Sequence, residues 1–205
     1  MRFAFSLIAP LALALSGCAT SQSPAPAATA SAPGAVSSAD PRATAAGEAI
    51  LAQGGSAVDA AIAVMLALTV VEPQSSGIGG GGFLIHDDGK GRVQSYDGRE
   101  TAPAAADGTW FYVDGKPLSV PQAIPGGRSV GVPGNIRLMA EAHRAHGKLP
   151  WSALFQPAIR LAREGFTVTP RLTAFLTRFK ASAALTEAGR AIYYQPDGTP
   201  LPAGT

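Results

Sequence analysis

The chain has 205 residues, of which 46% are hydrophobic and 15% are charged, and its formal net charge is +2. This composition is typical of a globular protein and excludes a fibrous one. Because the chain has no basic run with interleaved aromatic residues, nucleic acid is not an expected partner. Its single cysteine, Cys18, excludes an internal disulfide.

Residues 1–17 predict a secretion signal. Arg2 supplies a positive start, and an apolar run continues to Leu15. This run is too short to span a bilayer as a stable helix. The sequence Leu15-Ser16-Gly17-Cys18 resembles the lipobox of bacterial lipoproteins, which are cleaved before a cysteine that carries lipid. We therefore expect Cys18 to be lipidated and to anchor the protein in a membrane. The alternative is an ordinary cleaved leader with an incidental cysteine.

Residues 18–39 predict a disordered tether. From Ala19 to Ser38 the chain has no charged residue and consists almost wholly of Ala, Ser, Pro, Thr, Gln and Gly, which leaves little to bury. Ala19 after the cysteine resembles lipoproteins that are sent to the outer membrane. For a Gram-negative source we therefore expect a periplasmic protein that is lipid-anchored at the outer membrane.

The predicted folded region, residues 40–205, begins with two helices. Asp40-Pro41 combines a capping residue with a proline at the first helical position, and Gly54-Gly55 predicts the end of the first helix. Ser56 to Asp59 has the spacing of a capping box and precedes an apolar run that ends at Val71. Because this run is apolar on every face, we expect a central helix that is buried on all sides.

The next segment predicts a substrate pocket. Five of the six residues from Gly77 to Gly82 are glycine, and Gly98-Arg99 follows sixteen residues after the last of them. The segments 83–86 and 92–97 flank a turn-rich stretch and predict a hairpin, which would bring the glycines and Arg99 together. An arginine is well suited to bind a carboxylate. The glycines either line the pocket or let the strand lie close to the preceding helix.

The rest of the chain predicts a loop over 104–131, with a short strand at Trp110 to Val113, and then helices. The helices are expected from Val132-Pro133-Gly134 to His146, from Trp151 to Gly165 and from Pro170 onward. Tyr193 to Thr205 predicts a turn without a closing helix or strand. From this we expect an incomplete domain.

Two other groups of residues are weaker candidates. His143 and His146 lie three residues apart on one predicted helix and could bind a metal, but no acid or cysteine cluster supports them. Ser75 and Ser76 could be nucleophiles with His86 as the base, but no third group orients the histidine. We therefore interpret them as a solvated helix face and as capping hydrogen bonds, and we expect no metal and no cofactor.

Six motifs follow one another along the folded region. They are Gly54-Gly55-Ser56-Ala57-Val58-Asp59-Ala60-Ala61, Val71-Glu72-Pro73 through Phe83, Asp97-Gly98-Arg99-Glu100-Thr101-Ala102-Pro103, Val132-Pro133-Gly134, Gly147-Lys148-Leu149-Pro150-Trp151 and Ala162-Arg163-Glu164-Gly165-Phe166. In this order they resemble gamma-glutamyltransferases, and the similarity covers residues 43–205. The resemblance implies the N-terminal nucleophile hydrolase fold, an α+β four-layer αββα sandwich, of which this chain holds only the N-terminal portion of the large subunit.

The resemblance also implies an activity. Enzymes of this family break a γ-glutamyl amide, as in glutathione, and pass the acyl group to water or to an amino acid. Their nucleophile is a threonine at the start of the small subunit, beyond this chain, so we expect no catalytic residue here and no activity from this chain alone. Arg99 matches the family's arginine that binds the α-carboxylate of the γ-glutamyl group. The alternative is that Arg99 pairs with Glu100 or Asp97 and only holds the loop.

Two other functions stay open at this point. One is a β-lactam acylase of the same superfamily, which would need a different acyl pocket. The other is a non-catalytic lipoprotein, either a remnant of the enzyme or a module that only binds a γ-glutamyl compound through Arg99. In the enzymatic case the expected partners are γ-glutamyl compounds, the small subunit and, through Cys18, the membrane.

Overall fold

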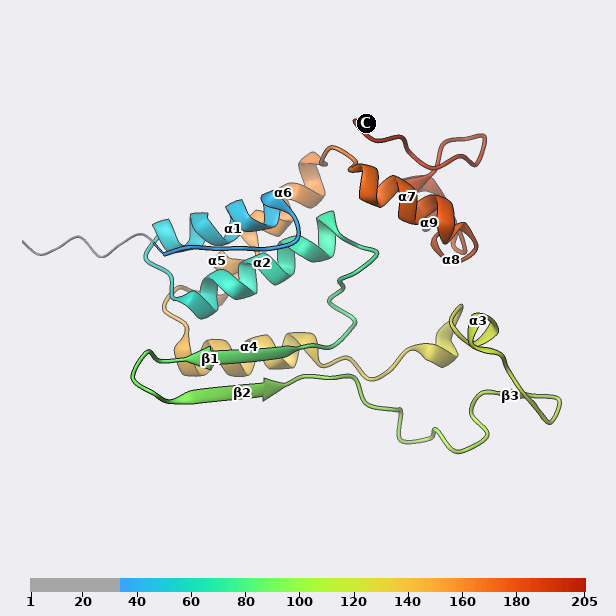
Figure 1. Ribbon diagram of the computed structural model, residues 1–205, viewed down its shortest axis with the longest axis horizontal. Coiled ribbons are helices and arrows are strands. Elements are labelled where there is room, and N and C mark those ends of the chain that lie inside the picture. Colours follow the sequence, from blue (N-terminus) through green and yellow to red (C-terminus); the bar gives the residue numbers. More distant parts are fainter. Residues whose placement is uncertain (1–33) are drawn as a thin grey trace, which may run out of the picture. The chain divides into compact units, whose positions relative to one another are not determined.

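The computed structural model describes residues 34–205 (Figure 1). The predicted signal peptide, Cys18 and the first part of the predicted tether lie outside the described residues. Helices predominate, and the strands form two separate antiparallel pairs. No helix within residues 34–205 combines the length and the apolar character needed to cross a membrane.

Both predicted helix starts are confirmed. Helix α1 spans Pro41–Ala52, and Asp40 Oδ1 accepts a hydrogen bond of 2.8 Å from the backbone N–H of Arg42. Helix α2 spans Ala57–Val71 and begins with a reciprocal capping box between Ser56 and Asp59. Gly54, which ends the α1 segment, has a φ of 86°, a conformation that glycine adopts without strain. Local sequence signals therefore predicted where α1 begins and ends and where α2 begins.

Asp59 also connects α2 to a distant turn. Its Oδ2 accepts hydrogen bonds from the backbone N–H groups of Ser56 at 2.9 Å, Lys148 at 2.9 Å and Leu149 at 3.1 Å. Burial of Asp59 opposes ionisation, but these backbone donors outweigh it, and the pKa of the carboxyl lies below its usual value. A charged group is thus stabilised inside the fold by three backbone dipoles.

Helix α2 is the central helix of the described region, but it is not buried on all sides. Val58, Ile62 and Leu66 belong to the main core cluster. Residues of α4 and of the turn after His146 also contribute to this cluster. On another side of the helix Ala61 is exposed and Met65 is half-buried. The prediction of complete burial is therefore wrong for this chain. An apolar side chain is buried only where another element packs against it, and the sequence does not show which faces of a helix have such a neighbour.

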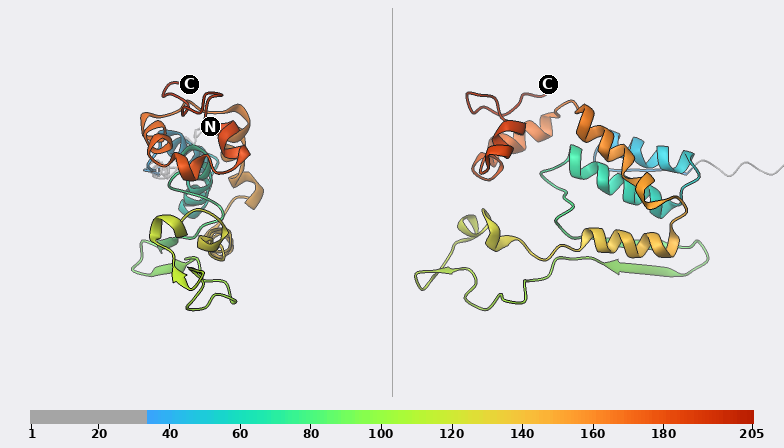
Figure 2. Two further views of the ribbon diagram at one scale, coloured as in Figure 1. Left: turned by 90° about the vertical axis from the view of Figure 1, so that its right-hand side faces the viewer. Right: turned by 180° about the vertical axis from the view of Figure 1, so that it is seen from behind.

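The predicted hairpin is confirmed. Strand β1, Phe83–Asp87, pairs antiparallel with β2, Val93–Asp97, so that Phe83 faces Asp97 and Asp87 faces Val93. Figure 2 shows the pair running alongside α4, and Leu84 belongs to the same core cluster as Leu138 of that helix.

Three helices follow from the start of α4. Helix α4 spans Asn135–His146, α5 spans Trp151–Leu154 and α6 spans Gln156–Glu164. The sequence predicted one helix from Trp151 to Gly165, but the structure divides it at Phe155. The reason is Pro157, which has no N–H to donate to the carbonyl of Ala153 and fits instead in the first turn of a new helix.

The predicted loop contains short elements. They are β3 at Tyr112–Val113, β4 at Lys116–Pro117, α3 at Val120–Ala123 and a 3₁₀ turn, η1, at Gly127–Ser129. Only the two residues of β3 correspond to the strand that was expected at Trp110 to Val113. Many apolar side chains of this region, including Val120 and Ile124, are exposed.

The last helices form a separate small core. Helix α7 spans Pro170–Arg178, α8 spans Lys180–Ala183 and α9 spans Glu187–Tyr193. Leu172 and Leu176 pack with Tyr194, whose hydroxyl donates a 2.8 Å hydrogen bond to the carbonyl of Leu176. The sequence predicted the start of α7 at Pro170 but missed α8 and α9.

Candidate functional site

Three segments that lie far apart in the sequence meet beside Arg99. The glycine loop, residues 77–82, pairs with Gly98 through two backbone hydrogen bonds, from Gly82 N at 3.2 Å and from Gly98 N at 3.0 Å. The start of α4 joins them, because the N–H groups of Gly134 and Asn135 donate to the carbonyl of Gly80 at 3.1 and 3.0 Å. The hairpin therefore brings the glycine loop and the Arg99 segment together, as predicted.

The glycines of the loop have two different roles. A Cβ atom on Gly81 would lie 2.6 Å from the backbone N of Glu100, and one on Gly82 would lie 3.0 Å from Asn135 Oδ1. In contrast, a Cβ atom on Gly77 or Gly79 would have no other atom within 4 Å. Close packing thus explains Gly81 and Gly82, whereas Gly77 and Gly79 leave open space. The interpretation that the glycines line a pocket fits Gly79, which borders a cleft beside Arg99. The close packing of Gly81 and Gly82 is against the Arg99 segment and Asn135, not against the preceding helix, so that alternative is wrong.

Glu100 connects the glycine loop to Arg99. Its Oε1 accepts a 2.7 Å hydrogen bond from Gly81 N, and its Oε2 lies 3.2 Å from Arg99 Nη1. Its own backbone N–H, the N–H of Gly81 and the charge of Arg99 lower the pKa of the Glu100 carboxyl, although partial burial opposes them. An ionised Glu100 therefore lies beside the guanidinium group and forms an ion pair with it.

The Arg99 side chain is 67% exposed and faces a cleft of about 590 Å³. Its backbone N–H donates to Asp97 Oδ1 at 2.9 Å, which fixes the turn after β2. We call this the Arg99 cleft. Its lining includes Gly79, Arg99, Thr101, Trp110, Phe111 and Arg128.

The ion pair with Glu100 does not remove Arg99 from the cleft. An exposed ion pair contributes at most about 1 kcal/mol, because water screens the charges. A carboxylate ligand could therefore compete for the guanidinium group, which offers five N–H donors. The structure shows that Arg99 pairs with the local acid Glu100 and also lines a cleft, so the carboxylate-binding role stays a prediction.

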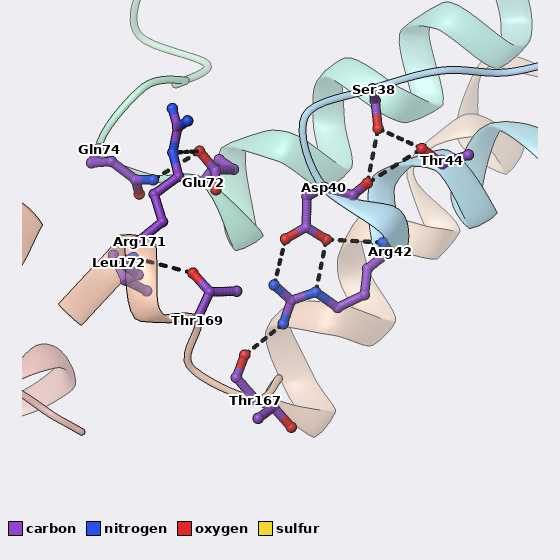
Figure 3. Close-up of polar contacts among 10 residues, drawn as sticks. All are labelled: Ser38, Asp40, Arg42, Thr44, Glu72, Gln74, Thr167, Thr169, Arg171 and Leu172. Atoms are coloured by element: carbon purple, nitrogen blue, oxygen red, sulfur yellow. Dashed lines mark hydrogen bonds and ion pairs between the residues drawn. The ribbon is translucent and has the colours of Figure 1, made fainter. Parts of the chain in front are cut away.

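The start of the glycine loop is fixed by a buried acid that sequence analysis missed (Figure 3). The side chain of Glu72 is only 4% exposed. Its Oε2 lies 3.1 Å from Arg171 Nε and accepts a 2.8 Å hydrogen bond from Gln74 Nε2. Arg171 also donates to Ser75 Oγ at 3.3 Å. No local pattern signals this contact, because its partners are far apart in the sequence.

A second cluster in Figure 3 joins α1 to the segment before α7. Arg42 Nε donates to Asp40 Oδ1 at 2.8 Å, and Arg42 Nη1 donates to the carbonyl of Thr167 at 2.7 Å. The hydrogen bond from Arg42 lowers the pKa of the Asp40 carboxyl.

Asn135 is another residue that sequence analysis did not select. Its Nδ2 donates to the carbonyl of Gly77 at 2.8 Å, while its Oδ1 is buried and has no hydrogen-bond partner among the described residues. Its position directly after Val132-Pro133-Gly134 was the one available signal. Asn135 thus closes the glycine loop against the start of α4.

The weaker candidates are not brought together as a catalytic group. His143 Nε2 lies 2.9 Å from the carbonyl oxygen of Leu149, whereas His146 stacks on His86 with ring centres 3.7 Å apart. Ser75 contacts Arg171 rather than His86. Within residues 34–205 no group of three His, Cys, Asp or Glu side chains is placed to bind a metal ion.

Comparison with known proteins identifies the family. The family model described as gamma-glutamyltranspeptidase matches residues 43–205. Glutathione hydrolase 3 of Arabidopsis thaliana is 41% identical over 172 residues, which are 83% of this chain and 26% of the relative. The chain thus spans about a quarter of the length of the curated relatives that it matches.

Solved structures agree with this result. The crystal structure of Helicobacter pylori gamma-glutamyltranspeptidase superposes with a TM-score of 0.78 at 29% identity, over 84% of this chain and 50% of that chain. A cephalosporin acylase from Bacillus halodurans superposes with a TM-score of 0.62 at 34% identity, over 79% of this chain and 31% of that chain. Sequence and structure therefore confirm the predicted family: the chain belongs to the gamma-glutamyltranspeptidase family and corresponds to the N-terminal part of its large subunit.

Proposed function

We propose that the protein containing this chain is a gamma-glutamyltransferase or glutathione hydrolase. It cleaves a γ-glutamyl amide, such as that of glutathione, and passes the acyl group to water or to an amino acid. The observation that carries this proposal is the position of Arg99, which faces the Arg99 cleft in a chain whose curated relatives include glutathione hydrolases.

Arg99 binds the α-carboxylate of the γ-glutamyl group. A guanidinium group forms two parallel, charge-assisted hydrogen bonds with a carboxylate and does not lose its charge. Glu100 supports this role, because its Oε2 lies 3.2 Å from Arg99 Nη1 while its Oε1 is held by Gly81 N at 2.7 Å. The acid that pairs with the arginine is itself fixed to the glycine loop.

The nucleophile belongs to the part of the protein that follows this chain. It is a threonine at the start of the small subunit, whose free α-amino group acts as its base. Residues 40–205 supply the N-terminal portion of the four-layer sandwich, and the small subunit is the partner that completes it. This chain alone binds part of the substrate but does not catalyse the reaction.

The proposed location follows from the first residues of the sequence. Cleavage before Cys18 leaves a lipidated cysteine, and residues 18–39 connect it to the folded region. The protein then acts in the periplasm from the outer membrane. Metabolic labelling with a palmitate analogue tests this proposal, because Cys18→Ser should abolish the label and release the protein from membranes.

The test of the function is the kinetics of the complete gene product with γ-glutamyl-p-nitroanilide. Arg99→Ala should raise KM by about thirtyfold or more, because two charge-assisted hydrogen bonds are lost, and Arg99→Lys should restore part of the affinity. Arg144→Ala is the matched control, since Arg144 is 69% exposed and its ion partner Glu141 lies on the same helix. A rate whose dependence on substrate is the same in Arg99→Ala and in the unchanged protein would exclude the carboxylate role.

A β-lactam acylase is the second candidate function, and the similarity to the cephalosporin acylase favours it. Substrates with the same leaving group distinguish the two. A γ-glutamyl amide carries an α-amino group next to the carboxylate, whereas a glutaryl amide lacks it. Faster turnover of the γ-glutamyl amide supports the first function, and faster turnover of the glutaryl amide supports the acylase. A gene product that turns over neither supports the non-catalytic alternative.

A further inference from the structure

We propose that Arg128 is a second anion-binding residue in the Arg99 cleft, and that it selects γ-glutamyl compounds whose leaving group ends in a carboxylate. This inference rests on the proposed function, because it assigns to Arg99 one carboxylate of the substrate and to Arg128 the other. It names a substrate class: γ-glutamyl peptides rather than γ-glutamyl amines.

Arg128 lies in the same cleft as Arg99, although 28 residues separate them in the sequence. It belongs to the short turn η1, which folds back over the segment that carries Trp110 and Phe111. The cleft therefore has a guanidinium group on each of two chain segments, with aromatic side chains in the same lining. This arrangement suits a ligand with two anionic ends and a less polar middle.

The Arg128 side chain is fixed by backbone contacts. Its Nη1 donates to the carbonyl of Tyr112 at 2.8 Å and to that of Trp110 at 3.2 Å, while the Trp110 indole Nε1 donates to the carbonyl of Arg128 at 2.8 Å. These reciprocal bonds orient the guanidinium group before any ligand arrives. A group that is already ordered loses less entropy when it binds a ligand.

The charge of Arg128 has no acidic partner within residues 34–205, where no carboxylate oxygen lies within ion-pairing distance of it. Its Nη1 donates to the two carbonyl groups named above, which leaves the N–H groups of Nε and Nη2 to bind a ligand. A carboxylate that accepts two hydrogen bonds matches this planar group.

Two acidic residues also line the cleft. Glu100 is paired with Arg99, as described above. Asp107 Oδ1 accepts hydrogen bonds of 2.8 Å from both the N–H and the hydroxyl of Thr109, and these bonds lower the pKa of its carboxyl. Asp107 is therefore ionised at neutral pH and repels an anionic ligand. Removing its charge should strengthen the binding of such a ligand, whereas removing the charge of Arg128 should weaken it.

The experiment compares two ligands that differ only at one end, γ-glutamylglycine and γ-glutamylglycinamide. Their affinities for the complete gene product are measured by titration calorimetry, or their kcat/KM values where they are turned over. The unchanged protein should prefer the carboxylate by about tenfold, the effect of one charge-assisted contact. Arg128→Gln should abolish this preference by weakening the binding of γ-glutamylglycine more than that of the glycinamide. Arg128→Lys should keep part of the preference, and Asp107→Asn should increase it.

Controls separate this proposal from a structural role and from the function on which it rests. Arg144→Ala removes one exposed positive charge on α4 and should not alter the preference. Equal affinity of the unchanged protein for the two ligands would overturn the Arg128 proposal alone, as would an equal loss for both ligands in Arg128→Gln. If Arg99→Ala leaves both affinities unchanged, the α-carboxylate assignment fails separately. A gene product that binds neither ligand refutes both.

Discussion

The closest packing in the glycine loop is at Gly81, and Gly81→Ala should therefore destabilise the protein strongly. The new Cβ would lie 2.6 Å from the backbone N of Glu100 and 2.7 Å from its Oε2. Because the first of these atoms belongs to the backbone, it cannot move aside as the end of a side chain can. The loop must instead separate from the Arg99 segment.

The expected cost combines overpacking with a lost hydrogen bond. Overpacking of a well-packed site costs about 1–3 kcal/mol, and loss of the bond from Gly81 N to the ionised Glu100 costs about 1.5–3 kcal/mol. Part of the strain is relieved when that bond breaks, so we expect a loss of about 3–4 kcal/mol in the free energy of unfolding. This is a large fraction of the stability of an ordinary domain.

Gly79→Ala provides the matched control in the same loop. Its Cβ would meet no atom within 4 Å, and Gly79 does not have a positive φ. The alanine also reduces the entropy of the unfolded chain, so the free energy of unfolding should stay within about 0.5 kcal/mol or rise slightly.

Urea unfolding of the two variants, followed by tryptophan fluorescence with linear extrapolation, measures the difference. If the loop behaves as the distances predict, the Gly81→Ala midpoint falls and that of Gly79→Ala does not. Similar losses in both variants would mean that glycine flexibility, rather than close contact with Glu100, decides the stability of the loop. An unchanged Gly81→Ala variant would refute the packing argument.

Three further predictions concern the buried acids. Asp59→Ala leaves three backbone N–H groups without their acceptor and should cost about 3 kcal/mol or more in urea unfolding, whereas Asp59→Asn keeps an accepting oxygen and should cost less. The pKa values of Asp40 and Asp59 are lowered from 3.8, so the stability that their ionised forms contribute is present above that pH and is lost as the pH falls below it. The urea midpoint should therefore fall between about pH 6 and pH 2.5. Asp40→Asn should make this fall smaller. Arg171→Ala leaves the buried Glu72 without its ion partner and should cost about 2–4 kcal/mol, and hydrogen exchange should show reduced protection at the start of the glycine loop; unchanged protection there would contradict this role.

Local chemistry explains which elements the sequence could predict. Asp40 and Ser56 accept hydrogen bonds from N–H groups within three residues of themselves, so a few neighbouring letters determine where α1 and α2 begin. The hairpin was predictable for the same reason, since its turn chemistry lies between its strands. The meeting of the glycine loop with Arg99 followed directly from the antiparallel pairing.

Contacts between distant residues explain what the sequence could not predict. The pairing of Glu72 with Arg171 and the contacts of Asp59 with the turn at Lys148 depend on how the helices pack. The elements between residues 112 and 129 have only two to four residues each, which is too few to show the repeat of apolar residues that predicts a helix or a strand. The break at Pro157 was visible in the sequence, but the apolar pattern on both sides of it suggested one continuous helix.

The hydrogen bonds that hold the Arg99 segment have a consequence for the order of folding. The backbone bonds of Gly82 with Gly98, of Gly134 and Asn135 with Gly80, and the side-chain bond from Asn135 to Gly77 all connect residues between 77 and 135. During synthesis, the hydrogen bonds of this segment can form once residue 135 has left the ribosome, because none of them needs a later residue. The arginine side of the pocket is then in place as a template against which the later residues fold.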